Sequence, residues 1–218
     1  MGARFDLLVF DWDGTIVDSA QHIVDSIQSA CRDLELPVPN PDDARHIIGL
    51  GMHDALTYLL PGLAAAEYPR LAERYGYHFR AGDHAVKLFP GAREGIEKLR
   101  GAGFLLGVAT GKSRRGLDRA LNDTGLQPYF HASRCADEGR PKPHPQMLEV
   151  LMDVLGTQPT RTLMIGDTSH DLEMARAAGV PALAVAYGAH PERKLRPFEP
   201  AACVFTFTEA MEWLNANA

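Results

Sequence analysis

The chain has 218 residues, 45% of them hydrophobic and 23% charged, with a formal net charge of −6 at pH 7, a composition that excludes a disordered chain. Its basic residues are scattered apart from two short clusters, so we expect no nucleic-acid partner. Apolar runs stay well short of the roughly 18 residues of a membrane span, and three widely spaced cysteines favour a reducing compartment, so we expect a cytoplasmic protein without a membrane partner.

The first predicted element is a buried strand over residues 5–10, FDLLVF. Asp11 follows this run directly, and Asp13 comes two residues later, in front of Gly14. Glycine gives a turn conformational freedom and leaves backbone amides exposed. Trp12, between the two acids, is expected to pack on the far face of the turn. The loop after the first strand therefore carries two carboxyl groups close together.

Residues 18–85 contain several helical patterns and no convincing strand. Helices are expected near 19–35, before Gly49, near 52–60 and near 67–80. Ser19 and Asp18 are candidates to cap the first of these helices. The sequence therefore predicts an inserted α-helical cap domain over residues 18–85, joined to the rest of the chain by two short linkers that could act as a hinge.

From residue 86 onward, apolar runs alternate with helical patterns. The predicted strands cover 104–110, 162–166 and 181–187, and the predicted helices lie near 91–100, 113–121, 144–155 and 172–178. This alternation is typical of a parallel sheet with crossover helices. The sequence therefore predicts an α/β fold, with a Rossmann-like parallel sheet core formed by residues 1–17 and 86–218 and the α-helical cap inserted into it.

Polar residues stand at the carboxyl ends of the predicted strands. Asp11 follows the first strand, Thr110 ends the second and Asp167 follows a later one. In an open α/β sheet, ligands bind beyond these ends, near the point where the strand order reverses, so the three side chains can converge. Two carboxylates about 4 Å apart repel by roughly 4 kcal/mol at an effective dielectric near 20. A cation is therefore expected, and oxygen ligands favour Mg²⁺.

Four segments resemble, in order and setting, the four motifs of the haloacid dehalogenase-like hydrolases. They are FDWDGTIVDS (10–19), VATGK (108–112), GRPKPHP (139–145) and GDTSHD (166–171). The helical insert after the first motif resembles the cap of the subgroup that contains the phosphoglycolate phosphatases. The resemblance spans essentially the whole chain. It implies a Mg²⁺-dependent phosphatase acting on a small phosphorylated metabolite, with 2-phosphoglycolate as the first candidate.

The resemblance also implies catalytic roles for individual residues. Asp11 would attack phosphorus and form an aspartyl-phosphate intermediate. Asp13 would protonate the departing alcohol and then activate the hydrolytic water. Thr110 and the amide of Gly111 would hold phosphate oxygens, while Lys142 would neutralise charge on the phosphoryl group and on the nucleophile.

A Mg²⁺ site is implied by the same resemblance. Its ligands would be the side chains of Asp11 and Asp167 and the backbone carbonyl of Asp13. Asp171, four residues after Asp167, is a further candidate metal ligand, and the alternative is that it supports the water ligands of the metal or orients the catalytic lysine. The exposed amides around Gly14 would contribute to phosphate binding.

In the insert, Gly49 and Gly51 are the best candidates for substrate recognition, because a helix–Gly-x-Gly–helix turn can aim backbone amides at an anion. The alternative is that these glycines only end one helix and begin the next. His170 lies within GDTSHD, near the site, but is not expected to be a ligand. Three histidines of the insert are expected at the surface: His22, His46 and His53.

Other functions stay open. A sugar phosphomutase on the same scaffold would also use an acid pair, but the related mutases tend to carry histidine where this chain has Ile23, which favours hydrolysis. Haloacid dehalogenation is disfavoured because that branch lacks the second aspartate, present here as Asp13. A non-catalytic binding or regulatory protein would be indicated by lost motif residues, and none is lost. The oligomeric state stays open between a monomer and a homodimer.

Overall fold

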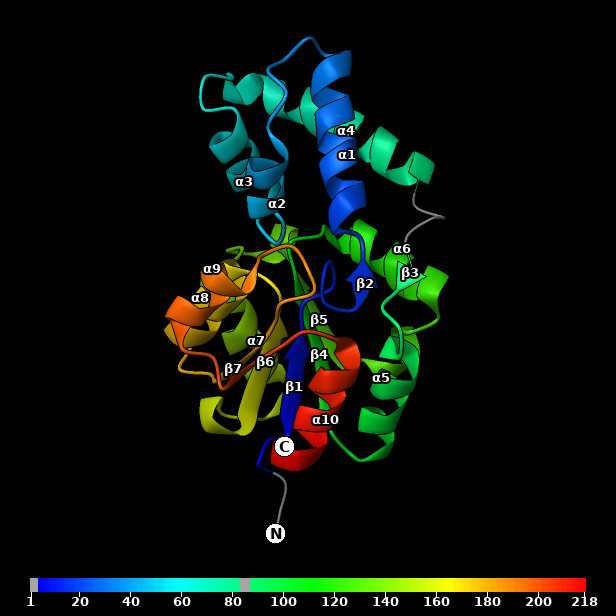
Figure 1. The fold of residues 1–218 in the computed structure, drawn as a ribbon, viewed down its shortest axis with the longest axis vertical. Helices are drawn as coiled ribbons and strands as arrows, with labels where there is room; N and C mark the ends of the chain where they lie inside the picture. The colour runs from blue at the N-terminus through cyan, green and yellow to red at the C-terminus, as the bar shows by residue number, and fades with distance from the viewer. Residues whose placement is uncertain (1–3, 83–86) are drawn as a thin grey trace.

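The computed structural model describes residues 4–82 and 87–218, and Figure 1 shows a sheet flanked by helices, with further helices above one end of it. These upper helices lie within residues 20–82, and we call them the helical layer. The second predicted linker falls partly on residues 83–86, outside the described residues. The site described below lies where the helical layer meets the sheet.

The main sheet has six parallel strands in the order β5-β4-β1-β6-β7-β8. They are β1 (Leu7–Phe10), β4 (Leu105–Thr110), β5 (Ala132–Cys135), β6 (Thr162–Gly166), β7 (Ala182–Val185) and β8 (Ala202–Val204). The central strand β1 pairs with β4 on one side and β6 on the other, so the strand order reverses there. This confirms the predicted parallel α/β sheet.

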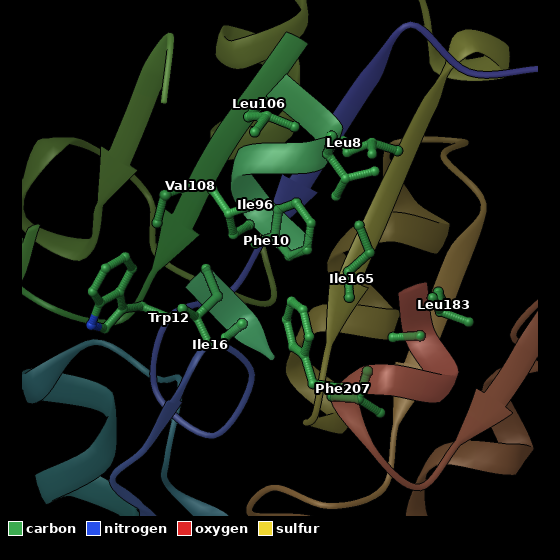
Figure 2. Close-up of a cluster of buried hydrophobic side chains, with 14 of the residues drawn as sticks. Leu8, Phe10, Trp12, Ile16, Ile96, Leu106, Val108, Ile165, Leu183 and Phe207 are labelled. Atoms are coloured by element: carbon green, nitrogen blue, oxygen red, sulfur yellow. The ribbon is translucent and has the colours of Figure 1, made fainter. Parts of the chain in front are cut away.

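The central strand is apolar on both faces because both faces are covered. Leu8 and Phe10 point into the core on one face, shown in Figure 2, while Leu7 and Val9 point into the core on the other. A strand that is buried on both sides is expected to be a continuous apolar run rather than an alternating one. This packing fixes the position of the residue that follows Phe10, which is Asp11.

Helices cover the two faces of the sheet. They are α5 (Ala92–Gly101), α6 (Arg114–Thr124), α7 (Gln146–Leu155), α8 (Ser169–Ala177), α9 (Glu192–Leu195) and α10 (Phe207–Asn217). Apolar side chains of α5, α6 and α10 belong to one core, and those of α7, α8 and α9 to the other. A short antiparallel pair of strands, β2 (Val17–Asp18) and β3 (Lys87–Leu88), lies where the chain passes to and from the helical layer.

The helical layer has an apolar core of its own, which includes Ile27, Leu56 and Leu71. Its helices are α1 (Ala20–Asp33), α2 (Pro41–His46), α3 (Met52–Leu59) and α4 (Tyr68–Gly82). These agree closely with the predicted helices, except that α2 ends at His46 and a turn over 47–50 leads into α3. Within the described parts of the chain, no helix is long and apolar enough to cross a membrane.

Candidate active site

The carboxyl ends of the central strands bring three aspartates together. Asp11 follows β1, whereas Asp167 and Asp171 come from the loop after β6 and the first turn of α8. All three are buried, and one ligand atom from each lies within 4.8 Å of the others. Thr110, at the end of the neighbouring strand β4, is also buried. The structure therefore brings together the strand-end residues that the sequence singled out.

The two carboxylate oxygens of Asp11 have different surroundings. Oδ1 lies 2.9 Å from the Lys142 ammonium and accepts a hydrogen bond of 2.6 Å from the backbone N–H of Trp12. Oδ2 is buried and has no hydrogen-bond partner among the described residues. Burial raises the pKa of Asp11 to about 7, against the opposing effect of Lys142 and with a further contribution from Asp171. Oδ1 of Asp11 is therefore fixed by Lys142 and the Trp12 amide, while Oδ2 is available to bind a cation or a substrate.

Asp167 is fixed by residues on two different loops. The Thr15 hydroxyl donates to Oδ1 at 2.7 Å, and the Ala189 backbone N–H donates to Oδ2 at 2.7 Å. A Cβ atom added at Gly14 or Gly188 would lie only 2.2 or 2.3 Å from Oδ2, so both positions require glycine. Burial and the charge of Asp11 raise the pKa of Asp167 well above its usual value.

Asp171 joins a helix cap to the catalytic lysine. Its Oδ2 accepts hydrogen bonds from the backbone N–H and the hydroxyl of Thr168, at 3.0 and 2.7 Å, within a capping box at the start of α8. Its Oδ1 lies 2.6 Å from Lys142 Nζ. Of the three roles that the sequence left open for Asp171, namely metal ligand, support of the metal's water ligands and orientation of the lysine, the geometry favours the last. The spacing of Thr168 and Asp171 is itself a capping-box signal that sequence reasoning missed.

Lys142 is completely buried between two carboxylates. Burial alone would lower its pKa, but Asp11 and Asp171 outweigh that effect and raise it above the usual value, so the ammonium stays charged. If Asp11, Asp167 and Asp171 are all ionised, three carboxylates face one ammonium and leave two negative charges in excess. That excess, the unpartnered Asp11 oxygen and the all-oxygen ligand set fit a hard divalent cation.

Asp13 lies outside this cluster, between two partners that sequence reasoning did not assign to it. Ser19 Oγ donates to Oδ1 at 2.7 Å, and Lys112 Nζ lies 3.0 Å from Oδ2. Ser19 holds the N-cap position of α1, as predicted, but its hydroxyl makes no capping hydrogen bond and donates to the carboxylate of Asp13 instead. The Lys112 ammonium also lies 4.6 Å above the ring of Phe79 in α4.

The turn over residues 47–50 lies directly on the catalytic residues. A Cβ atom at Gly49 would be 3.3 Å from Thr168 Oγ1 and 3.9 Å from Asp11 Oδ2, and one at Gly111 would be 2.6 Å from the Gly49 carbonyl oxygen. Gly49 has a φ of +92°, which favours glycine. Gly51 is the N-cap of α3 and packs against Pro141. The helical layer therefore contacts the second, third and fourth motifs.

A second contact between the helical layer and the sheet uses three histidines. The His46 carbonyl oxygen accepts hydrogen bonds from Nε2 of His170, at 2.7 Å, and of His190, at 3.2 Å. Burial lowers the pKa of all three imidazoles, that of His190 to about 4. His46 and His22, predicted at the surface, are partly exposed, with His22 bonded to the Phe79 carbonyl, whereas His53 is exposed. None of these three histidines lines the cavity beside the aspartates.

Trp12 occupies the position expected of it. Its side chain is 1% exposed and packs edge-on against Phe130, with ring centroids 6.3 Å apart. Figure 2 shows it at the end of the same apolar core as Phe10 and Val108. Trp12 therefore anchors the loop between the two acids in the apolar core, although it also contributes to the lining of the cavity beside them.

A parallel sheet that gathers three buried aspartates and a buried lysine beneath a helical layer defines an α/β enzyme of the hydrolase type. Residues 8–185 match the family described as haloacid dehalogenase-like hydrolase. The chain therefore belongs to the haloacid dehalogenase-like hydrolase family, as the four motifs predicted.

Individual relatives agree with this assignment. The chain is 38% identical over 210 residues to "Probable phosphatase IndB" of Dickeya dadantii, covering 94% of this chain and 91% of that protein. It is 30% identical over 207 residues to a phosphoglycolate phosphatase of Mesorhizobium japonicum, with coverage of 92% and 91%. Its fold is similar to that of a hydrolase from Pseudomonas syringae, with a TM-score of 0.86 at 20% identity, covering 98% and 99% of the two chains.

Proposed function

We propose that the protein is a Mg²⁺-dependent phosphatase that hydrolyses a small phosphorylated metabolite through an aspartyl-phosphate on Asp11. The observation that carries this proposal is the buried Asp11 carboxylate, with one oxygen paired to Lys142 and the other without a partner among the described residues. The relatives named phosphatases support the reaction class.

The charge balance supports a divalent cation. The side chains of Asp11 and Asp167 and the backbone carbonyl of Asp13 would hold it, and Asp171 would stay paired with Lys142. When bound, Mg²⁺ supplies positive charge that offsets the repulsion between the carboxylates and an incoming phosphate. Mg²⁺ is the preferred ion because it uses few carboxylates and leaves room for phosphate oxygens.

The first chemical step forms a bond between an Asp11 carboxylate oxygen and phosphorus and breaks the bond from phosphorus to the leaving oxygen. Asp13, held by Ser19 and Lys112, donates its proton to that oxygen as it departs. The hydroxyl of Thr110 and the amides near Gly111 and Gly14 hold the phosphoryl oxygens. Lys142 stays charged and close to Asp11 throughout, so it offsets the charge on the phosphoryl group.

The second step returns the enzyme to its starting state. Asp13, now ionised, takes a proton from a water molecule as that water attacks phosphorus. The bond between Asp11 and phosphorus breaks, inorganic phosphate leaves, and Asp13 is again protonated. Positioning and charge stabilisation are the main needs of phosphoryl transfer, and the buried Lys142 and the hydrogen-bonded Asp13 supply both.

We further propose that residues 18–85 act as a cap domain over this site and that Gly49 and Gly51 help to enclose the substrate. The contact of the 47–50 turn with Gly111 and Thr168 supports this role. Phosphoglycolate phosphatases among the relatives make 2-phosphoglycolate the reference substrate for any assay. The composition of the chain supports a cytoplasmic location, and the sequence favours no choice between a monomer and a homodimer.

The test measures phosphate release from p-nitrophenyl phosphate with Mg²⁺ and with EDTA. Asp11→Asn is expected to lower kcat by at least ~10³, because the covalent route is closed. Asp153→Asn, at an exposed position on α7, is the matched control and should leave kcat unchanged. Single-turnover hydrolysis in H₂¹⁸O should place ¹⁸O in the released phosphate and none in the Asp11 carboxylate, because the water attacks phosphorus and the Asp11 carboxylate keeps both of its oxygens. Unchanged activity of Asp11→Asn, or label found in the Asp11 carboxylate, would contradict the proposal.

A further inference from the structure

A cavity of about 640 Å³ lies between the helical layer and the sheet. Asp11, Asp13 and Thr110 line it on the side of the sheet, so it opens onto the groups that would carry out the chemistry. Its other walls come from α1, α3 and α4, which lie above the sheet in Figure 1, and from α6, which flanks the sheet. A leaving group attached to a phosphate at Asp11 would extend into this space.

The size of the cavity exceeds what a two-carbon leaving group needs. Pockets of roughly 300–1,000 Å³ are typical of sites that enclose drug-sized molecules. With about 640 Å³, this cavity lies well inside that range. A glycolate group would leave most of the volume filled with water, and little of the apolar wall would be desolvated on binding.

The chemistry of the walls is as informative as the volume. Every residue that α1 and α3 contribute to the cavity is apolar: Ile23, Ile27, Met52, Ala55, Leu56 and Leu59. The aromatic ring of Phe79 adds to the same wall from α4. A carboxylate on the leaving group would find no cation among the residues that α1 and α3 contribute to the wall.

Charged side chains also line the cavity. Lys112 stands beside Asp13, Arg80 follows Phe79 by one residue on α4, and α6 contributes Arg115, Arg119 and Asp123. Arg115 is exposed, and the Lys112 ammonium is already paired with Asp13. The wall formed by α1 and α3 is therefore apolar, whereas the charged side chains belong to α4, to α6 and to the surroundings of the reacting groups.

We infer that the site takes phosphate monoesters with a bulky, mainly apolar leaving group, in preference to 2-phosphoglycolate. This inference rests on the proposed phosphatase function and names its substrate class. Binding energy from a part of the substrate that does not react can raise kcat/KM. Because each methylene in an apolar pocket is worth about 1–3 kcal/mol, a ring should raise kcat/KM by at least about tenfold.

The test compares three substrates: 2-phenylethyl phosphate, ethyl phosphate and 2-phosphoglycolate. The first two release alcohols of similar acidity, so a difference between them reports binding of the ring rather than leaving-group reactivity. The expected result is a kcat/KM for 2-phenylethyl phosphate at least about tenfold above both others. A kcat/KM for ethyl phosphate or 2-phosphoglycolate equal to or above it overturns the inference while leaving the phosphatase proposal intact. No Mg²⁺-dependent release from any substrate overturns the phosphatase proposal itself.

A pair of variants tests whether the preference for 2-phenylethyl phosphate depends on the apolar wall of the cavity. Ala55→Phe would fill part of the apolar wall and is expected to lower kcat/KM for 2-phenylethyl phosphate at least about tenfold, with a smaller effect on ethyl phosphate. Ala72→Phe makes the same change in α4 at a separate, smaller hollow and should alter neither. Equal loss for both substrates in a folded Ala55→Phe protein would contradict the inference. If circular dichroism shows that Ala55→Phe is unfolded, Ala55→Leu replaces it. The order of the three substrates by kcat/KM in the wild-type protein still tests the inference.

Discussion

The two sides of the site are built on opposite principles. On the side of the sheet, Lys142, Asp167 and Asp171 are wholly buried charges, each fixed by ion pairs or hydrogen bonds of 2.6 to 3.0 Å. On the side of the helical layer, the contacts are backbone atoms of a glycine turn and apolar side chains. Buried charges demand one geometry, because an unpaired charge is costly, whereas apolar surfaces tolerate changes of shape.

This difference links the sheet side to the reaction and the helical layer to the choice of leaving group. The sheet side can hold a phosphoryl group and a cation in only one way, so it sets the chemistry. The helical layer can be altered residue by residue without disturbing the buried charges, so it is suited to setting the leaving group. The predictions below test this separation by perturbing first the sheet side, then the boundary between the two, then the helical layer.

Lys142→Met should have the largest effect, because it leaves Asp11 and Asp171 buried without their counter-charge. Breaking a buried pair typically costs about 3–5 kcal/mol, and we expect that loss in the free energy of unfolding measured in urea. The kcat should fall by ~10³ or more, as the phosphoryl charge is no longer offset. Lys98→Met, in the last turn of α5, is the control. Wild-type stability of Lys142→Met would show that the sheet side is not governed by charge pairing.

Asp167→Asn should abolish Mg²⁺ binding. In the wild-type protein, the affinity for Mg²⁺ should depend on pH. Without a cation, burial raises the pKa of Asp11 from 3.8 to about 7 and that of Asp167 well above its usual value. The folded state then holds protons that the unfolded state has lost, so the metal-free protein loses stability as pH rises from about 4 to 7. Mg²⁺ must displace these protons, and its affinity should rise about tenfold from pH 6 to pH 8 for Asp11 alone.

Calorimetry in buffers of different ionisation enthalpy measures both the affinity and the protons released. Asp167→Asn should bind Mg²⁺ too weakly to detect, because one of the proposed carboxylate ligands is gone. Asp153→Asn should behave as wild type. An affinity independent of pH would mean that Asp11 and Asp167 are already ionised without the cation.

The sheet side is also the part that the sequence predicts best. The runs that became β1, β4, β6 and β7 are apolar throughout because both faces of the sheet are covered, and the residue after each run can be read directly from the sequence. Two strands of the main sheet escaped prediction, as did the two-residue strands β2 and β3. β5 reads Ala-Ser-Arg-Cys and is mostly half-buried, so it forms no apolar run, and β8 is apolar but has only three residues.

Side chains that act through distant contacts could not be predicted in the same way. Thr15 and Ala189 bind Asp167 only because the loops after β1 and β7 meet in space. Lys112 reaches Asp13 across the end of β4, and nothing local marks that contact. Ser19 looked like a helix cap because caps are the commonest role of a serine before a helix. In each case the partner is fixed by tertiary packing, which no short segment contains.

Lys112→Met tests the boundary between the two sides. The Lys112 ammonium contacts both Asp13 and the Phe79 ring of the helical layer, so its loss should leave the general acid less well positioned. We expect kcat to fall about 10- to 100-fold, within the usual contribution of general acid–base catalysis. Because the Lys112 and Asp13 side chains are only 13% and 10% exposed, the free energy of unfolding should also fall, by less than the about 3–5 kcal/mol of a fully buried pair. Lys112→Arg should restore part of kcat. Equal losses of kcat and stability would indicate a merely structural lysine.

Gly49→Ala should give the smallest effect and bears on the helical layer alone. The φ of +92° disfavours alanine, and the added Cβ would lie 3.3 Å from Thr168 Oγ1. A non-glycine residue in this region costs about 1–2 kcal/mol, which urea unfolding should detect. Because the turn can shift away from the sheet, we expect KM to rise a few-fold while kcat changes little. Gly62→Ala, where a Cβ would meet nothing within 4 Å, is the matched control and should change neither quantity. A fall in kcat at unchanged KM would instead place Gly49 with the charged side of the site, because the turn would then act on the reacting groups rather than on substrate enclosure.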